Sequence, residues 1–413
     1  MPKLDDIIVG LDIGTTKVCT VIGQVRPAGI EILGVGIAPS YGLRKGVVVN
    51  IDSTVDSITK SIEEAELTAG VEVDSVYAGI AGGHIKGINT RGMVAISSRN
   101  REITKADVNR AIDSAKAISI PMDREVIHVF TQEFKVDDQD GIKEPVGMSG
   151  SRLEVEAHIV TGAVTSAENI VKSINRAGYQ VNDIVLQPFA SSKAVMSQEE
   201  KELGEVLIDL GGGTTDLVMY INGSIWHTGV LSIGGNHVTN DISIGLRIPN
   251  ITAENIKKDF AIAAQNLIED DIKIDLPSIA GRDSRQCPLS ELTEIVEARE
   301  IEIFDLIARE LESTGFKDLI SGGVVLTGGG SLLKGTEYLA EKVLKMPVRI
   351  GYPVGVQGLN EQVANPIYST AVGLVLYGYK NIDVKKIFKN TKSAGSSFTD
   401  IFERMVSWLK EFF

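Results

Sequence analysis

Two short loops rich in glycine and threonine contain the residues best suited to chemistry. One lies in VGLDIGTTKVCTVI, positions 9–22, and the other in IDLGGGTTDLVMY, positions 208–220. In each, an aspartate near the end of an apolar, strand-like run is followed by glycine and threonine. Glycine lets backbone N–H groups approach a ligand closely, and threonine hydroxyls add donors. This composition favours phosphate binding, although either loop alone could be a plain glycine turn.

The two segments form an internal repeat when Asp12 is aligned with Asp209. The other matched positions are one glycine and two threonines: Gly14, Thr15 and Thr16 in the first copy, and Gly211, Thr214 and Thr215 in the second. In this alignment the second copy has two additional glycines, and Asp216 replaces Lys17. The copies lie 197 positions apart (209 minus 12), a spacing expected of domains. We therefore predict two related halves, each opening with a strand–loop–strand hairpin.

The elements around the glycines exclude two common phosphate motifs. In a P-loop or a dinucleotide fingerprint a helix follows the glycines, whereas here a second apolar strand follows, and GxxxxGK[ST] is absent. A third loop, in SGGVVLTGGGSLLKGTEYLAEKVL at 321–344, has the order strand, glycines, amphipathic helix. A loop at the end of a strand that leads into a helix is a common ligand site in open α/β sheets.

Composition narrows the class of protein. The 413 residues suffice for two or more domains, and a net charge of -14 argues against a nucleic-acid-binding surface. Two distant cysteines and five histidines form no metal-binding cluster and indicate a reducing cytoplasm. We find no signal peptide and no run of about 18 apolar residues that could span a bilayer.

The three loops, taken in order, resemble those of the actin-like ATPase superfamily. The resemblance implies an α/β, ribonuclease H-like fold of two domains with ATP in the cleft between them. It also implies the nucleotide-binding loop residues, which are Gly14, Thr15, Thr16, Lys17, Gly211, Gly212, Gly213, Thr214, Thr215, Gly328, Gly329, Gly330 and Ser331. Asp12 and Asp209 are expected to hold Mg²⁺, mostly through water, as this hard cation prefers.

Further segments match the same superfamily. In TAENIKKDFAIA, Glu254 and Lys257 share one helix face by their i, i+3 spacing and are expected to reach the adenosine, or else to form a surface ion pair. VLQPFASSKAV, 185–195, and NPIYSTAVGLVLYG, 365–378, resemble the two interdomain helices, with Gln187 near the attacking water. The small residues of the second segment are expected to allow close packing.

An insertion at about 84–165 resembles the subdomain of the FtsA family of bacterial cell-division proteins. Its segment ITKADVNRAIDSAK predicts a helix with Thr104 as N-cap and Asp107 at the third helical position. The resemblance to this family is nearly continuous from Met1 to about Lys380. It implies the following division of the chain: 1–83 with 166–194 and 365–380 as domain 1A, 84–165 as the inserted α+β subdomain 1C, 195–238 with 305–364 as domain 2A, and 239–304 as subdomain 2B.

The chain ends with a polar, lysine-bearing segment, 381–397, which we interpret as a flexible linker, followed by FTDIFERMVSWLKEFF. At about 100° per residue, the apolar side chains of this last segment fall in one arc of roughly 160°. They are Phe398, Ile401, Phe402, Met405, Val406, Trp408, Leu409, Phe412 and Phe413. A helix of about 24 Å with a charged face lies on a membrane rather than across it. The alternative is a helix packed on the protein's own core or on a partner.

The favoured hypothesis is an ATP-binding adaptor of the FtsA type with at most weak ATPase activity. By resemblance, it polymerises, tethers FtsZ filaments to the cytoplasmic membrane at the division site as a peripheral protein, and helps recruit later division proteins. The FtsZ C-terminal tail is expected to bind 239–304, where Arg282 and Arg285 precede a helix, although a solvated loop is also compatible. The alternatives are a PilM-like pilus-assembly scaffold and an actin-fold small-molecule kinase.

Overall fold

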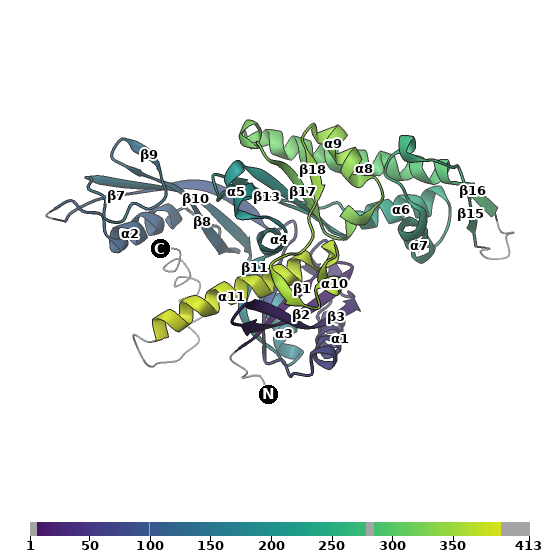
Figure 1. Cartoon of the computed structure of the whole chain (residues 1–413), viewed down its shortest axis with the longest axis horizontal. Coiled ribbons are helices and arrows are strands. Elements are labelled where there is room, and N and C mark those ends of the chain that lie inside the picture. Colours follow the sequence, from purple (N-terminus) through teal and green to yellow (C-terminus); the bar gives the residue numbers. More distant parts are fainter. Residues whose placement is uncertain (1–5, 99, 278–284, 390–413) are drawn as a thin grey trace.

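The computed structural model describes residues 6–98, 100–277 and 285–389. Two domains are each built on a sheet (Figure 1). Five strands of the first sheet, read from β3 to β11, match the five strands of the second, read from β14 to β18. The first sheet has the order β11-β6-β1-β2-β3-β19 and the second β14-β13-β12-β17-β18. The strands of the first are β1 (Ile7–Ile13), β2 (Lys17–Arg26), β3 (Gly29–Pro39), β6 (Ser75–Ile80), β11 (Gln180–Leu186) and β19 (Val356–Gly358). Those of the second are β12 (Glu205–Leu210), β13 (Thr215–Ile221), β14 (Ser224–Leu231), β17 (Gly323–Thr327) and β18 (Val348–Ile350).

The pairing within the two sheets confirms the predicted repeat. In each, an antiparallel hairpin leads to a third antiparallel strand, and a parallel strand lies on the other side of the first strand. The central strands are almost entirely apolar and buried. Such continuous apolar runs require cover on both faces, as in parallel α/β sheets. Helix α1 (Ile51–Ala69) packs on β2 and β3, and α3 (Val164–Arg176) packs on α1 and β11.

The helices α4 (Gln187–Val195) and α11 (Ser369–Lys389) cross each other closely. A Cβ atom on Gly373 would lie 1.9 Å from the carbonyl oxygen of Ala190, and one on Gly10 would lie 2.3 Å from that of Ala371. The prediction that small residues allow close packing here is confirmed. Because α11 continues to Lys389, the predicted linker is helical from 381 to 389. Its remainder and the predicted membrane helix, 398–413, lie outside the described residues.

The insertion forms a separate four-stranded sheet in the order β7-β10-β8-β9, with its own apolar core. Its elements are β7 (Lys86–Ala95), α2 (Lys105–Lys116), β8 (Arg124–Val136), β9 (Gln139–Ile142) and β10 (Arg152–Ala163). Helix α2 begins at the predicted N-cap, where Thr104 and Asp107 form a reciprocal capping box. The insertion contacts β14 of the second domain through polar bonds, such as Asn89 Nδ2 to the carbonyl of Trp226 at 3.1 Å.

Region 239–304 packs into the same apolar core as the second sheet. Its elements are α6 (Gly235–Gly245), α7 (Asn250–Phe260), β15 (Lys273–Leu276), β16 (Arg285–Pro288) and the first part of α8 (Leu289–Ser313). The limits expected at 239 and 304 therefore fall inside two helices. The remaining elements are β4 (Leu43–Arg44), β5 (Val47–Val48), α5 (Gln198–Leu203), α9 (Thr336–Leu344) and α10 (Asn360–Val363), with short 3-10 turns. Among the described helices, none combines the length and apolar character needed to cross a membrane.

Candidate functional site

The two glycine–threonine loops connect the central hairpins and close in the same way. Between β1 and β2, the N–H of Gly14 donates to the carbonyl of Lys17 at 2.9 Å. Between β12 and β13, the N–H of Gly211 donates to the carbonyl of Thr214 at 3.0 Å. Both predicted strand–loop–strand hairpins are thus present, and each loop starts just after the aspartate-bearing end of its first strand.

The two loops have equal lengths, so the predicted two additional glycines in the second copy are wrong. In the ladders, Asp12 lies opposite Cys19 and Asp209 lies opposite Asp216, a separation of seven residues in both. Asp216 therefore takes the place of Cys19, not of Lys17. The sequence alignment matched the two threonine pairs by residue identity and therefore gave the wrong equivalence. In a hairpin, equivalent positions are determined by strand register.

The tips of the two loops touch each other. A Cβ atom on Gly212 would lie 1.8 Å from Oγ1 of Thr16, and one on Gly213 would lie 2.7 Å from Oγ1 of Thr15. The Thr15 hydroxyl also accepts a hydrogen bond from the N–H of Gly46 at 3.1 Å. Two glycines of the second loop thus make room for two threonines of the first. The site is formed jointly by both domains.

Asp12 is held by a base and an amide. Lys17 Nζ lies 3.3 Å from Asp12 Oδ2, and Gln187 Nε2 donates to Oδ1 at 3.1 Å. Burial acts to lower the pKa of Lys17. The charge of Asp12, together with its hydrogen bond and the smaller effects of Cys19 and Asp209, outweighs burial, and the pKa is raised. The lysine is therefore a stable cation at the first loop. Gln187 is the first residue of α4, so this bond connects the loop to an interdomain helix.

Asp209 is held by hydroxyls from both interdomain helices. Ser191 of α4 donates to Asp209 Oδ2 at 2.8 Å, and Thr370 of α11 donates to the same oxygen at 3.3 Å. Burial and the charge of Asp12 raise the pKa of Asp209, and these hydrogen bonds oppose the shift. Sequence reasoning missed Ser191 and Thr370, because hydroxyls in apolar helices give no signal of their partner.

Asp216 is the third acid of this centre, and it was not predicted from the sequence as a site residue. It is buried, it accepts a hydrogen bond from Thr214 Oγ1 at 3.0 Å, and its other oxygen has no hydrogen-bond partner among the described residues. Burial and the neighbouring charge of Asp209 raise its pKa to about 8. An aspartate directly after two threonines, on a strand otherwise apolar, is the signal that could have identified it.

The third glycine loop lies against the end of β12. Gly328 has a left-handed φ of 82°, and a Cβ atom there would lie 2.3 Å from Oδ1 of Asp209. A Cβ on Gly330 would lie 2.8 Å from the side chain of Leu210. Ser331 closes the turn by donating to the carbonyl of Gly328 at 2.7 Å. The predicted third loop therefore meets the second loop at Asp209.

Glu254 and Lys257 lie on α7 and pair at 2.7 Å. Lys257 Nζ also donates to Thr239 Oγ1 at 2.8 Å and to the carbonyl of Gly235 at 3.1 Å. Burial acts to raise the pKa of Glu254. Its hydrogen bonds to Lys257 and Thr239 and the charges of Lys257 and Lys258 together outweigh burial, so the pKa is lowered and the side chain is an anion. The two side chains of the pair are partly buried, 16% and 25% exposed.

The N-terminus of α6 connects this pair to the second loop. The N–H of Gly235 donates to the carbonyl of Gly211 at 2.9 Å, and the N–H of Asn236 donates to that of Gly212 at 2.8 Å. Sequence reasoning did not select these residues, although the adjacent glycines in SIGGNH were a signal. The structure thus brings together all three glycine loops and the Glu254–Lys257 pair.

The chain is similar in sequence to cell-division proteins over almost its whole length. Family models match at 206–373 (cell division protein FtsA) and at 82–161 (the SHS2 domain inserted in FtsA). Cell division protein FtsA of Pseudomonas aeruginosa is 45% identical over 411 residues, covering 98% of this chain and 97% of that protein. The chain belongs to the FtsA family. FtsA of Escherichia coli is 37% identical over 418 residues, with 98% of each chain covered. This member of the FtsA family is accordingly an actin-like cell-division protein.

Solved structures support the fold of this FtsA-family chain. A PilM–PilN type IV pilus biogenesis complex contains a chain with a TM-score of 0.66 and 17% identity, covering 90% of this chain and 98% of that one. MreB5 of Spiroplasma citri bound to ADP has a TM-score of 0.56 and 14% identity, covering 92% and 99%. At these identities the likeness concerns the fold alone. The predicted two-domain actin-like ATPase fold with an inserted α+β subdomain is confirmed.

One further predicted site residue of the FtsA-family chain, Arg285, lies away from this centre. Arg285 begins β16, and its guanidinium donates to the carbonyl of Leu246. Figure 1 places β15 and β16 at the end of the second domain remote from the insertion. Arg282 and the predicted membrane-binding side chains of 398–413 lie outside the described residues.

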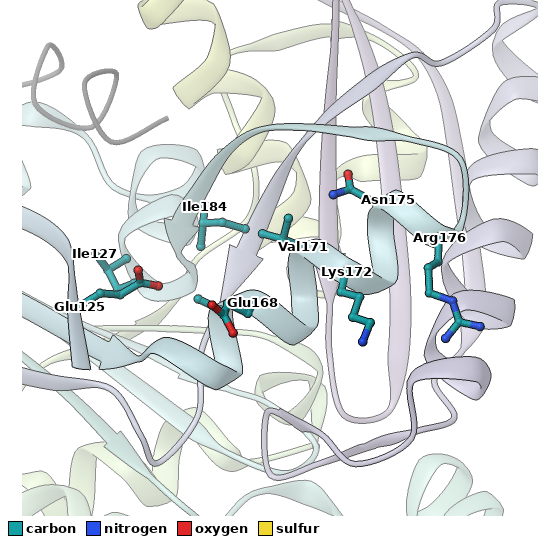
Figure 2. A pocket seen from close by; sticks show the side chains of 9 residues that line it. Glu125, Ile127, Glu168, Val171, Lys172, Asn175, Arg176 and Ile184 are labelled. Carbon is teal, nitrogen blue, oxygen red and sulfur yellow. The ribbon is translucent and has the colours of Figure 1, made fainter. Parts of the chain in front are cut away.

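A groove of about 620 Å³ lies elsewhere, along α3 and the start of β8 (Figure 2). Its centre is apolar, with Val171 and Ile184. Glu168 lies toward one end, and Arg176 toward the other. The groove contains no residue that was predicted from the sequence. Arg176 is paired with Asp52 at 2.7 Å.

Proposed function

We propose that this FtsA-family protein binds ATP at the three glycine loops, assembles into polymers, and tethers FtsZ filaments to the cytoplasmic face of the cell membrane at the division septum. There it helps recruit later division proteins. The observation that carries the proposal is the contact of the two loops across the domains, with Asp12 and Asp209 each bonded to an interdomain helix. A ligand at these loops touches both domains at once.

The phosphates of ATP are proposed to bind the backbone N–H groups and threonine hydroxyls of the two hairpin loops, with Lys17 as the cation. Glycine backbone and a nearby ammonium group are the donors that phosphate sites commonly use. The third loop and the Glu254–Lys257 pair are proposed to hold the adenosine. Solved MreB5 structures with a related fold contain ADP and AMPPNP, which is consistent with this assignment.

Mg²⁺ fits the acids of this centre. Asp12 and Asp209 offer the oxygen ligands that this ion prefers, and Mg²⁺ keeps several of its own waters. Among the described residues, no group of three or more histidine, cysteine or acidic side chains is arranged to enclose a metal ion. We propose that the ion is held by these two carboxylates through water and by the phosphates. When bound, Mg²⁺ would neutralise phosphate charge.

Gln187 is proposed to orient the attacking water, with weak hydrolysis at most. The side-chain amide of Gln187 donates to Asp12, and Gln187 is the first residue of α4. A movement of Asp12 on phosphate binding would therefore be transmitted to this interdomain helix through the Gln187 side chain. Ser191 and Thr370 provide the same connection from Asp209. Bound ATP would therefore influence the angle between the domains, on which polymer contacts depend.

The amphipathic segment 398–413 is proposed to attach the protein to lipid, and 239–304 to receive the FtsZ tail, with Arg282 and Arg285 contributing positive charge. One short helix binds a membrane reversibly, whereas a polymer presenting many helices binds firmly, because later contacts are intramolecular. Family membership supports the cell-division role, and the apolar arc supports attachment.

The nucleotide assignment is tested with Asp209→Ala. Magnesium-dependent binding of a fluorescent ATP analogue should fall at least tenfold, because the ion loses one of its two carboxylates. Asp305→Ala, which removes an exposed acid from α8, is the matched control and should bind like wild type. Unchanged affinity in Asp209→Ala, with a native circular dichroism spectrum, would refute the assignment.

A further inference from the structure

Three lysines gather around the C-terminal end of α4. They are Lys193 of α4, Lys201 of α5 and Lys380 of α11; the first two are partly buried and the third is exposed. Lys193 Nζ lies 4.5 Å from the ring centre of Phe189 and 6.0 Å from that of Tyr377. Lys201 Nζ lies 5.4 Å from the ring centre of Tyr220. Aromatic faces thus line the two partly buried ammonium groups.

An acid beside these lysines is already bonded to other donors. Glu200 adjoins Lys201, but one of its oxygens accepts from Arg349 at 2.7 Å and the other from the N–H of Ser197 at 2.7 Å. None of the three lysines forms an ion pair with a carboxylate of the described part of the chain. Lysine is almost never fully buried in proteins unless it is paired.

This arrangement destabilises the charged form of Lys193 and Lys201, so the pKa of each is lowered. Burial and the charges of Lys380 and Lys201 lower the pKa of Lys193 to about 7. Burial and the charge of Lys380 lower the pKa of Lys201 to about 8, while Glu200 opposes the shift. Contact with an aromatic face stabilises a cation but does not remove the repulsion between cations. A bound anion would remove it.

We infer that Lys193, Lys201 and Lys380 bind the phosphate of an anionic phospholipid headgroup. The inference rests on the proposed membrane attachment and adds a second lipid contact to it. Lys380 is followed in α11 by three more lysines up to Lys389, and the predicted membrane helix begins nine residues later. Through Lys380, the cluster is therefore connected along α11 to the segment proposed to bind lipid. Basic groups next to a membrane anchor favour anionic lipids.

The overall charge of the protein makes such a site useful. A net charge of -14 is repelled by an anionic membrane surface, and the charges of the segment 398–413 nearly cancel. A local basic cluster offsets this repulsion only where it reaches the lipid. Each ammonium group has three donors, which suit the several acceptor oxygens of a phosphate.

The test is flotation of the full-length protein with phosphatidylcholine vesicles, with and without phosphatidylglycerol. For the wild type, phosphatidylglycerol should strengthen binding. In Lys193→Met/Lys201→Met this gain should fall roughly tenfold or more, while binding to neutral vesicles is retained. Lys60→Met/Lys342→Met removes the same charge from two exposed sites on α1 and α9 and should keep most of the gain. An unchanged gain in the first variant would overturn the inference.

Three further measurements separate the possible failures. If wild type binds no vesicles, the proposed membrane attachment itself fails. If wild type binds neutral and anionic vesicles equally and Trp408→Glu abolishes binding, the result supports membrane attachment through 398–413 and refutes the phospholipid site at the three lysines. If inorganic phosphate competes as well as soluble short-chain phosphatidylglycerol, the site accepts free phosphate and the lipid assignment is wrong.

A measurement on wild type covers the case in which the double variant does not fold. The titration of Lys193, followed by NMR of its side chain, should move to higher pH when soluble short-chain phosphatidylglycerol is added. A nearby opposite charge stabilises the ammonium form. A titration that does not move would contradict the inference without any substitution.

Discussion

Gly212 of the second domain lies directly against Thr16 of the first, so that a methyl group on Gly212 would sit 1.8 Å from the threonine hydroxyl oxygen. The two residues are tip residues of loops that repeat within the chain, at successive positions of the corrected alignment. Their contact joins the domains at the centre of the candidate site. It also explains why the second loop has glycine where the first has threonine.

Gly212→Ala should therefore force the loops apart. Overpacking of this kind costs about 1–3 kcal/mol, and we expect a lower melting temperature together with at least tenfold weaker ATP binding. In the Thr16→Ala background, Gly212→Ala should lower the melting temperature only slightly, because the side chain that it would clash with is gone. Calorimetry and nucleotide titration measure both effects.

Gly329→Ala is the matched control for this experiment. A Cβ atom there has no neighbour nearer than 3.7 Å, and the residue lies in the third loop of the same site. Its stability should be close to that of wild type. If Gly212→Ala is equally harmless, the contact between the loops is not tight.

Asp216→Asn should remove part of the pH dependence of stability. Burial raises the pKa of Asp216 from 3.8 to about 8, so the folded state binds an additional proton between these values. The free energy of unfolding therefore falls as pH rises from about 4 to about 8 and then levels off. The amide avoids this loss, and at pH 7 we expect a gain on the order of 1–3 kcal/mol in urea denaturation.

The exposed Asp305→Asn provides the reference, and its pH profile should follow wild type. A profile for Asp216→Asn that retains the wild-type slope would show that other groups, such as Asp209, carry the effect.

Glu254→Gln should weaken adenine-nucleotide binding by about fivefold to tenfold with little loss of stability. The substitution keeps the shape but removes a partly exposed ion pair with Lys257, which contributes at most about 1 kcal/mol. Lys257 would then be held less firmly beside Gly235. Isothermal titration with ATP measures the change, and Glu294→Gln, an exposed site on α8, serves as control. Equal affinities would leave the pair a structural role only.

Charge reversal at Arg282 and Arg285 should weaken binding of an FtsZ tail peptide at least fivefold, because such tails contain acidic residues. ATP affinity should stay constant, since Figure 1 shows β16 at the end of the second domain, far from β1 and β2. Fluorescence anisotropy with a labelled tail peptide measures the effect. A wild-type dissociation constant in the double variant removes these arginines from the binding site.

Trp408→Glu should release the protein from membranes. It introduces a charge into the middle of the apolar arc, where burial of each large side chain contributes at most about 1.5–3 kcal/mol. Vesicle flotation and septal localisation in cells measure the result, with Ser407→Glu on the polar face as control. Retained flotation of Trp408→Glu would indicate that the segment binds another protein instead.

Local patterns in the sequence determined the elements that build this protein. Two apolar strands around glycine and threonine predict each hairpin, a strand before the third glycine run predicts the next loop, and Thr104 with Asp107 predicts the start of α2. These features depend on neighbours only a few residues apart, so composition and spacing reveal them. The similarity of the two halves was visible for the same reason.

Only the tertiary structure decided how the halves meet. Asp12 and Gln187 are 175 residues apart, and Asp209 and Thr370 are 161 apart, so no local pattern connects them. Strand register, not letter matching, showed that the two loops are equally long and that Asp216 stands beside Asp209. The burial that raises the pKa of Asp216, and that of Lys193 near two other lysines, arises from packing between distant helices and strands. Desolvation depends on what surrounds a group in three dimensions, and that is set by the whole fold.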